Sequence, residues 1–373
     1  MEKKIVILHI LFVSNNKTSG VRNIVPKHLE YQAHIANVAL LNCNNTEVEE
    51  ADGKYNVYKL EEIQNKEIKN LPEPFNNPDL VVFHAIYYSQ YINLYKQCKK
   101  NNIPYIIVPH GSLTKQAQKQ KWIKKIPANI LLFNGFVNNA IAIQYLIEGE
   151  MEKSRNNRKY IIAGNGIELS NTQKQYVNNK LEQFKIIYIG RYDTYTKGLD
   201  LLIKAVSLIK DFMRQNSIKV LLYGTDYRGR QKQIEQLINY YKIKDIVEMN
   251  GPVWGEEKIK AMCDADIFIQ PSRTEGQPVG LMEAIEIGLP CIITEETNYG
   301  KIVEEEKIGW MIKIDEKDLA NKIVEAYKNK GNLQKMSENG KKYAKNNFEW
   351  KIIAKRTVES YIKILKEGER NEE

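Results

Sequence analysis

Short apolar runs rich in β-branched residues alternate with helical segments along nearly the whole chain of 373 residues. Strands that are buried on both faces of a sheet read as continuous apolar runs, so this alternation predicts parallel βαβ units with helices on both sides. The runs are residues 5–13, 80–83 and 105–108 in the first half, and residues 185–189, 219–223, 267–270 and 290–294 in the second. We therefore predict an α/β chain with two Rossmann-like halves.

The length of the chain predicts two domains with a cleft between them, because a single hydrophobic core rarely extends over so many residues. The polar stretch 170–183 (SNTQKQYVNNKLEQ) separates the two sets of strands and suits an exposed connection. We expect an N-terminal domain over residues 1–170, a second domain over 171–347 and a final segment over 348–373. That segment predicts an amphipathic helix, with apolar positions at Trp350, Ile353, Tyr361, Ile362 and Leu365.

Composition narrows the class of protein. The chain is 43% hydrophobic and 27% charged, as in globular proteins, and its longest apolar run is too short to cross a bilayer. The net charge of +9 favours anionic partners, although no nucleic-acid-binding module is present. The four cysteines are far apart in sequence, so they predict neither a zinc site nor a redox pair, and a cytoplasmic location is expected.

The strongest motif is PSRTEGQPVGLMEA over residues 271–284, directly after a predicted strand. Ligands of open α/β sheets bind where the strands end at their carboxyl side. A tight loop over residues 276–280 opens a helix there, and the free N–H groups of a helix start suit phosphate or sugar oxygens. Glu275 precedes this helix and Glu283 lies one to two turns into it, so the two carboxylates could hold different parts of an elongated ligand.

A second motif follows the predicted strand 185–189. Gly190 and Arg191 end that strand, and Lys197 opens the next helix. An arginine and a lysine at a strand-to-helix junction favour a bound anion. The alternative is a pair of solvated surface cations.

The N-terminal half holds weaker candidates. His84 in VVFHA and His110 in VPHGSL each end a predicted strand, where a histidine is either a structural hydrogen-bonding group or part of a site. Gly20 closes a polar loop over residues 15–20, just after the first strand. The turn Gly164-Asn165-Gly166 is expected to end a strand without taking part in chemistry.

These motifs together resemble glycosyltransferase family 4, whose members are retaining enzymes of the GT-B fold. The segment 275–283 is similar to the E-x7-E region of that family. The resemblance implies that Glu275 contacts the hydroxyls of the donor sugar, that Glu283 holds the nucleotide ribose and that Arg191 and Lys197 bind the donor diphosphate. It further implies a donor site made up of Gly20, Gly190, Arg191, Lys197, Glu275, Gly276, Gln277, Pro278, Val279, Gly280 and Glu283.

The resemblance also implies a place for the histidines and for the last helix. His110 would lie near the transferring sugar, with His84 as a further candidate on the acceptor side, and the last helix would return to the N-terminal domain. One departure concerns Gln277-Pro278-Val279, which stands where an aromatic residue often follows the Glu-Gly pair. The identity of the sugar is therefore left open.

The activity implied is transfer of a sugar, with retention, from a nucleoside-diphosphate sugar to a glycan or lipid-linked acceptor. No cofactor and no metal are expected. Asp264-Ala265-Asp266 has the form of a metal-binding DxD motif, but it precedes a predicted strand and so lies at the wrong end of the sheet. Two alternatives stay open, a nucleotide-sugar epimerase or hydrolase and a non-catalytic partner subunit.

Residues 115–136 combine basic, aromatic and apolar side chains, as surfaces that bind anionic membranes do. An ordinary solvated helix face is the competing interpretation. The residues are Lys115, Lys119, Lys121, Trp122, Lys124, Lys125, Ile130, Leu131, Leu132, Phe133 and Phe136.

Overall fold

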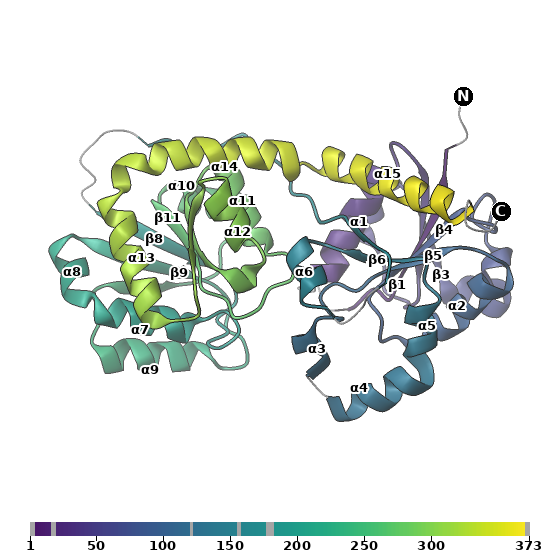
Figure 1. Cartoon of the computed structure of the whole chain (residues 1–373), viewed down its shortest axis with the longest axis horizontal. Helices are drawn as coiled ribbons and strands as arrows, with labels where there is room; N and C mark the ends of the chain where they lie inside the picture. Colours follow the sequence, from purple (N-terminus) through teal and green to yellow (C-terminus); the bar gives the residue numbers. More distant parts are fainter. Residues whose placement is uncertain (1–3, 16–19, 120–121, 155–157, 177–182, 370–373) are drawn as a thin grey trace. The chain divides into compact units, whose positions relative to one another are not determined.

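The computed structural model describes residues 4–15, 20–119, 122–154, 158–176 and 183–369. The chain divides into two compact units, one made of Met1–Gly166 with Trp350–Glu373 and the other of Ile167–Glu349. Each unit is a parallel sheet with helices on both faces (Figure 1). The predicted α/β class with two Rossmann-like domains is confirmed.

The first unit is built on a seven-stranded sheet with strand order β3-β2-β1-β4-β5-β6-β7. All adjacent pairs are parallel, so the carboxyl ends of the strands share one edge. The strands are β1 Val6–Leu11, β2 Asn37–Asn42, β3 Asn56–Lys59, β4 Leu80–His84, β5 Tyr105–Val108, β6 Ala142–Tyr145 and β7 Tyr160–Ile162.

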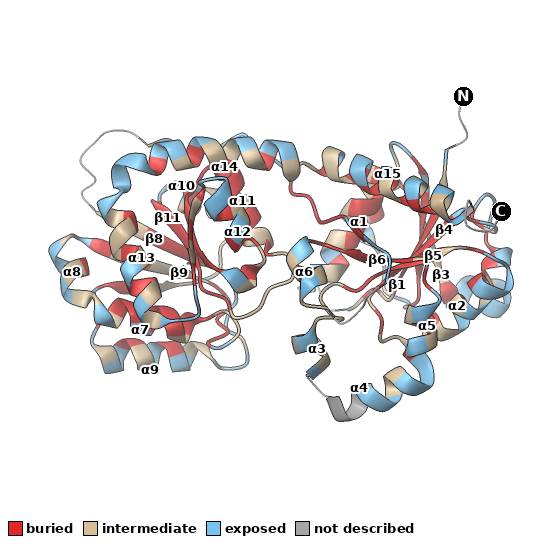
Figure 2. Ribbon diagram, in the orientation of Figure 1, coloured by how far each residue is buried: buried red, intermediate tan, exposed pale blue. Residues whose placement is uncertain are grey.

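Alternate side chains of β1 enter two different cores, one on each face of this sheet. Leu8 and Ile10 pack with residues of α2, whereas Ile7 and Leu11 pack with residues of α1 and α15. Figure 2 shows the resulting buried strands. The helices are α1 Gly20–Gln32, α2 Ser89–Lys100, α3 Lys115–Lys119, α4 Trp122–Ala128, α5 Asn134–Asn138, α6 Glu148–Glu152 and α15 Trp350–Glu369, with a π-helical turn over Asn129–Phe133.

The helix α15 belongs to the first unit although it ends the chain. Its first residue, Trp350, stacks on Tyr31 of α1 and meets the edge of His28. Gly166 lies so close that a Cβ there would be 2.6 Å from the indole ring. The glycine of the Gly164-Asn165-Gly166 turn is thus required by packing, and Asn165 Oδ1 lies 3.1 Å from His28 Nε2.

The second unit has a six-stranded parallel sheet with strand order β10-β9-β8-β11-β12-β13. Its strands are β8 Phe184–Ile189, β9 Ile218–Tyr223, β10 Val247–Asn250, β11 Ile267–Gln270, β12 Cys291–Thr294 and β13 Gly309–Ile312. Its helices are α7 Leu199–Leu208, α8 Lys210–Gln215, α9 Gln231–Tyr241, α10 Gly255–Cys263, α11 Val279–Ile287, α12 Gly300–Glu305, α13 Glu316–Lys328 and α14 Leu333–Asn347. The apolar side chains of α7, α9 and α13 fill the core on one face of the sheet.

The boundary between the units differs from the prediction. It falls at Gly166. Residues 171–173 and 175 of the predicted connection are exposed, but Lys174 and Tyr176 pack on the second unit, and residues 177–182 lie outside the described residues. Lys174 is buried with its ammonium group on the carbonyl of Cys263, and the Tyr176 hydroxyl donates to the carbonyl of Asp266. A polar sequence can line a domain in this way because long side chains bury their stems while their polar ends find partners.

Among the residues that the structure describes, no helix is long and apolar enough to cross a membrane.

Candidate functional site

Two loops of the second unit meet at the carboxyl edge of its sheet. One joins β8 to α7 and the other joins β11 to α11, and β8 and β11 are neighbours in the sheet. Gly198 has a positive φ of 69°, and a Cβ on it would lie 1.9 Å from the carbonyl oxygen of Pro271. Arg273 N also donates to the carbonyl of Thr196. Only glycine permits this approach, which holds the two loops against each other.

The loops bring Lys197 and Glu275 together. Lys197 Nζ lies 2.6 Å from Glu275 Oε1, and both side chains are largely buried, with 18% and 11% exposed. Gln270 Nε2 and Ser272 Oγ donate to the same oxygen over 2.8 and 2.7 Å. Three donors therefore fix the carboxylate through Oε1 and leave Oε2 for a ligand.

The backbone that follows Glu275 is held from a third loop. Asn298 Nδ2 donates to the carbonyls of Glu275 and Gly276, and the Gln277 amide donates to the Tyr299 hydroxyl. The helix α11 then begins at Val279 with Pro278 in an extended conformation before it. The first turn of any helix has N–H groups without intrahelical partners, so Val279 and Gly280 can offer donors to an anion.

Glu283 lies in α11 and pairs with Lys258 of α10. Glu286, one turn further along, is buried, and its Oε1 accepts from the backbone N–H of Ser170. Burial raises the pKa of Glu286 to about 7. Glu283 thus has a half-buried ion pair, while Glu286 packs against the segment around Ser170.

Gly190 and Arg191 follow β8 directly. A Cβ on Gly190 would clash with the hydroxyl of Tyr188, at 2.6 Å. The Arg191 guanidinium is exposed and lies 4.6 Å from the centre of the Tyr227 ring. The guanidinium of Arg228 lies 5.0 Å from the same ring centre. Arg191 is therefore held by a cation–π contact.

Sequence reasoning missed the supporting residues Gln270, Ser272, Asn298, Lys258 and Tyr227, because their roles depend on loops that only the fold brings together.

In the first unit, His84 and His110 form part of a row of histidines. His84 Nδ1 lies 3.1 Å from His110 Nε2, and His84 Nε2 lies 3.0 Å from Nδ1 of His9, a residue of β1 that the sequence did not single out. Burial lowers the pKa of His9 and of His110 to about 3 and that of His84 well below its ordinary value. All three rings are therefore neutral near pH 7. His110 has a positive φ of 47° and the N–H of the next residue, Gly111, donates to Glu150.

Comparison with known proteins shows what the second unit is similar to. Residues 170–343 match the family model of glycosyl transferases group 1. This segment is therefore similar to that family. All the candidate residues at the carboxyl edge of the second sheet lie inside it.

The chain is also 31% identical over 180 residues to WcaL of Escherichia coli K12, named as a colanic acid biosynthesis glycosyltransferase. That match covers 46% of this chain and 43% of WcaL, so it spans less than half of that relative. Two solved structures share the fold over nearly the whole chain. One is sucrose-phosphate synthase from Thermosynechococcus elongatus, with a TM-score of 0.71 and 18% identity over 97% of this chain and 99% of that one. The other is HepE of Anabaena with UDP and glucose, with a TM-score of 0.69 and 15% identity over 96% of this chain and 99% of that one. The fold is therefore GT-B.

Outside residues 170–343, Gly20 is the first residue of α1, with open space where a Cβ would stand. Most of the polar loop predicted over residues 15–20 lies outside the described residues. Arg22, which sequence reasoning missed, is buried in the first turn of α1 and donates to the carbonyl of Ser14.

Inside residues 170–343, Asp264 and Asp266 flank the start of β11 at the amino edge of the sheet. Asp264 follows α10 as its C-cap. Asp266 is buried, accepts from the N–H of Lys185 and lies 3.7 Å from Lys174 Nζ. Its carboxylate, at the start of β11, therefore already contacts β8 through Lys185 and the segment before β8 through Lys174.

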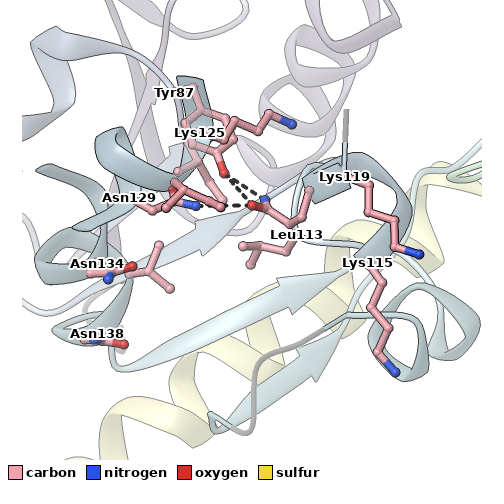
Figure 3. Close-up of a pocket in the computed structure, with 12 residues that line it drawn as sticks. Tyr87, Leu113, Lys115, Lys119, Lys125, Asn129, Asn134 and Asn138 are labelled. Atoms are coloured by element: carbon pink, nitrogen blue, oxygen red, sulfur yellow. Dashed lines mark hydrogen bonds between the residues drawn. The ribbon is translucent and has the colours of Figure 1, made fainter. Parts of the chain in front are cut away.

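The segment 115–136 borders a pocket of about 420 Å³ in the first unit (Figure 3). Gln118 joins the Tyr87 hydroxyl, the carbonyl of Ser112 and the Asn129 amide inside it. Lys115 and Lys119 are exposed, as are Ile130 and Leu131. Phe133 and Phe136 are buried instead, because the sheet needs apolar cover on that face. Lys121 lies outside the described residues, and the same holds for the side chains of Trp122 and Lys124.

Proposed function

We propose that the protein is a retaining glycosyltransferase that moves a sugar from a nucleoside-diphosphate sugar to an acceptor hydroxyl. The observation that carries this proposal is the Lys197–Glu275 pair, held between two loops at the carboxyl edge of the sheet in the segment that is similar to glycosyl transferases group 1. The presence of UDP and glucose in the structure of HepE, a protein of the same fold, supports a nucleotide-sugar donor.

In this proposal each residue binds a different part of the donor. Arg191 and Lys197 bind the diphosphate, while Glu275 accepts hydrogen bonds from sugar hydroxyls through its Oε2. Glu283 binds the ribose, and the N–H groups over residues 276–280 add neutral donors. The ion pair of Lys197 with Glu275 places a cation beside the carboxylate that holds the sugar, which is the arrangement needed at the bond between sugar and phosphate.

Catalysis in this proposal comes from charge stabilisation. As the glycosidic bond of the donor breaks, negative charge grows on the leaving diphosphate, and preorganised cations stabilise that charge more than they stabilise the bound donor. Arg191 and Lys197 supply two such cations, so we propose that turnover needs no divalent metal and no cofactor.

The biological setting rests on relatives. WcaL is named for colanic acid biosynthesis and AmsK of Erwinia amylovora for amylovoran biosynthesis. We propose that this protein likewise acts in the synthesis of a cell-surface polysaccharide or glycoconjugate, on a glycan or lipid-linked acceptor.

We further propose that the segment 115–136 meets an anionic membrane surface from the cytoplasmic side. Its exposed lysines, Lys115 and Lys119, lie in the same segment as the exposed apolar side chains of Ile130 and Leu131. This is the combination of charges and apolar groups that holds peripheral proteins at anionic lipid.

A binding screen tests the proposal. The purified chain is titrated in a calorimeter with nucleoside diphosphates, the corresponding monophosphates and nucleoside-diphosphate sugars. Binding of a diphosphate and of its sugar ester is expected, with weaker binding of the monophosphate, which lacks one of the groups that Arg191 and Lys197 contact. Absence of binding to every diphosphate would contradict the proposed function.

A further inference from the structure

A row of buried and half-buried polar side chains crosses the first unit from the end of β7 to the end of β5. It starts at the backbone carbonyl of Ala163, which accepts from Gln144 Nε2 over 2.9 Å. Gln144 Oε1 in turn lies 2.6 Å from the hydroxyl of Tyr361 in α15. On the other side of Tyr361 stands Gln32 of α1, and its Oε1 lies 3.0 Å from His9 Nε2. The row ends with His9, His84 and His110.

The direction of every hydrogen bond in this row follows from its first member. A backbone carbonyl can only accept, so Gln144 must turn its NH₂ group to Ala163 and its oxygen to Tyr361. The Tyr361 hydroxyl has one proton, and that proton goes to Gln144.

The orientation of the Gln32 amide follows from its two neighbours, Tyr361 and His9. Burial raises the pKa of Tyr361, and the side chain of Gln32, which lies beside the Tyr361 hydroxyl, opposes this rise. Gln32 Nε2 has no hydrogen-bond partner of its own. Turning the amide round would place its oxygen against the lone pairs of the tyrosine. The NH₂ group therefore faces Tyr361, and the oxygen faces His9.

The tautomer of each histidine then follows from that of the one before it. A neutral imidazole has one donor and one acceptor nitrogen. His9 gives the proton on Nε2 to Gln32, so its Nδ1 accepts from Nε2 of His84. Nδ1 of His84 likewise accepts from Nε2 of His110. The burial of His9 and His84, at 0% and 3% exposed, keeps both rings neutral, which the alternation of donors and acceptors requires.

We propose that Gln144, Tyr361, Gln32, His9 and His84 are positioning residues that hold His110 as the Nε2–H tautomer. Nδ1 of His110 is then a hydrogen-bond acceptor for a substrate hydroxyl at the carboxyl edge of the first sheet. The role of Nδ1 toward a sugar rests on the proposed function, whereas the tautomer itself does not.

The tautomer is measured directly by NMR. Long-range proton–nitrogen correlation spectra of the full chain, with nitrogen-15 in its histidines, distinguish a protonated from an unprotonated Nδ1. At pH 7 we expect the spectra to show unprotonated Nδ1 in His9, His84 and His110, with signals assigned by single replacement of each histidine. His110 with a proton on Nδ1 in the unmodified protein would overturn the proposal without any variant and without any measurement of turnover.

Two variants of Gln32 test whether the row sets the tautomer. Gln32→Glu keeps an oxygen acceptor toward His9 and is expected to preserve the Nε2–H tautomer of His110. Gln32→Leu removes the acceptor, and we expect His110 to populate both tautomers. A single unchanged tautomer in Gln32→Leu would show that the row does not control it.

Tyr361→Phe tests the more distant end of the row. The change frees the Gln32 amide to turn, so a mixture of tautomers is expected at His110, 251 residues away in sequence. The matched control is Tyr145→Phe, which removes a buried hydroxyl of the same unit outside the row. His28, which pairs with Asn165, serves as an internal reference in every spectrum. Equal effects of the two tyrosine changes on His110 would contradict the proposal.

Discussion

Lys197 Nζ lies 2.6 Å from Glu275 Oε1, although the two residues are 78 positions apart in sequence. The contact depends on Gly198, since a side chain there would push the loop that bears Lys197 away from Pro271. Because both groups are largely buried, their interaction is screened by salt less than a surface pair would be. The pair thus holds a cation and a carboxylate in a fixed arrangement at the carboxyl edge of the sheet.

The two glutamates of α11 and its preceding loop should affect different steps. Glu283→Ala is expected to weaken binding of a free nucleoside diphosphate by about 10- to 100-fold, the loss of a hydrogen bond to a charged group. Glu275→Ala should lower turnover and leave the affinity for the free diphosphate within about threefold, because the proposed function assigns its carboxylate to the sugar. Calorimetry with the diphosphate and a turnover assay measure the two effects. Equal losses of diphosphate affinity in both variants would contradict the assignment.

Binding to anionic vesicles should depend on the lysines of the segment 115–136. The protein is expected to sediment with vesicles that contain phosphatidylserine at low salt and to be released as salt rises, because salt screens the attraction. Replacing Lys115 and Lys119 by Glu should abolish the effect. The control replaces Lys99 and Lys100, two exposed lysines at the end of α2. If both double variants sediment equally, the segment is an ordinary solvated face.

Acid should destabilise the first unit through its buried histidines. The folded pKa is about 3 for His9 and His110 and about 4 for His28, below the ordinary 6.5. Their contribution to stability is therefore complete above about pH 6.5 and is lost as the pH falls toward the folded values.

Each of these histidines can contribute a slope of up to about 1.4 kcal/mol per pH unit, because the unfolded chain binds a proton that the folded chain excludes. Urea unfolding followed between pH 7.5 and 5 should show the midpoint falling steadily. His34→Gln, a change at an exposed histidine, should leave the slope unaltered. A midpoint that stays constant over this range would contradict the burial of neutral rings.

Glu286 predicts the opposite dependence on pH in the second unit. Its folded pKa of about 7 lies above the ordinary 4.5, so the folded state is penalised as the pH rises through this range. Glu286→Gln keeps an oxygen for the Ser170 N–H and should raise the free energy of unfolding by about 1–3 kcal/mol at pH 8. At pH 4.5 no gain is expected. Denaturant unfolding at the two pH values measures the difference, and an equal gain at both would rule out the raised pKa as its cause.

The sequence predicted seven of the described strands, β1, β4, β5, β8, β9, β11 and β12, because each coincides with a clear apolar run. The predicted run 105–108 coincides with β5, and the run 267–270 coincides with β11. The strands β2, β3, β6, β7, β10 and β13 were not predicted, since short apolar runs with polar neighbours do not distinguish a strand from a loop or a helix. The connection between the units was placed several residues too late, because burial of Lys174 and Tyr176 depends on partners in distant strands.

The candidate site was predictable to the level of motifs and no further. Lys197 and Glu275 could each be singled out by position after a strand, but their contact follows from the adjacency of β8 and β11, which are not consecutive in sequence. His9 lies inside a predicted apolar run, so the sequence indicated only that it belongs to a strand. Its contact with His84 requires the pairing of β1 with β4, which no local pattern specifies.

The central claim is that Lys197 stabilises the leaving diphosphate of a nucleotide sugar. The most direct measurement is donor turnover by the unmodified protein and by Lys197→Ala, each with and without EDTA, with Lys204→Ala on the exposed face of α7 as the control. We predict that Lys197→Ala loses about 10²- to 10³-fold in rate, or about 3–4 kcal/mol, while donor affinity changes much less. EDTA should have no effect, and Lys204→Ala should turn over at the normal rate. Strong inhibition by EDTA, or a nearly normal rate for Lys197→Ala, would show that the charge of the diphosphate is stabilised elsewhere.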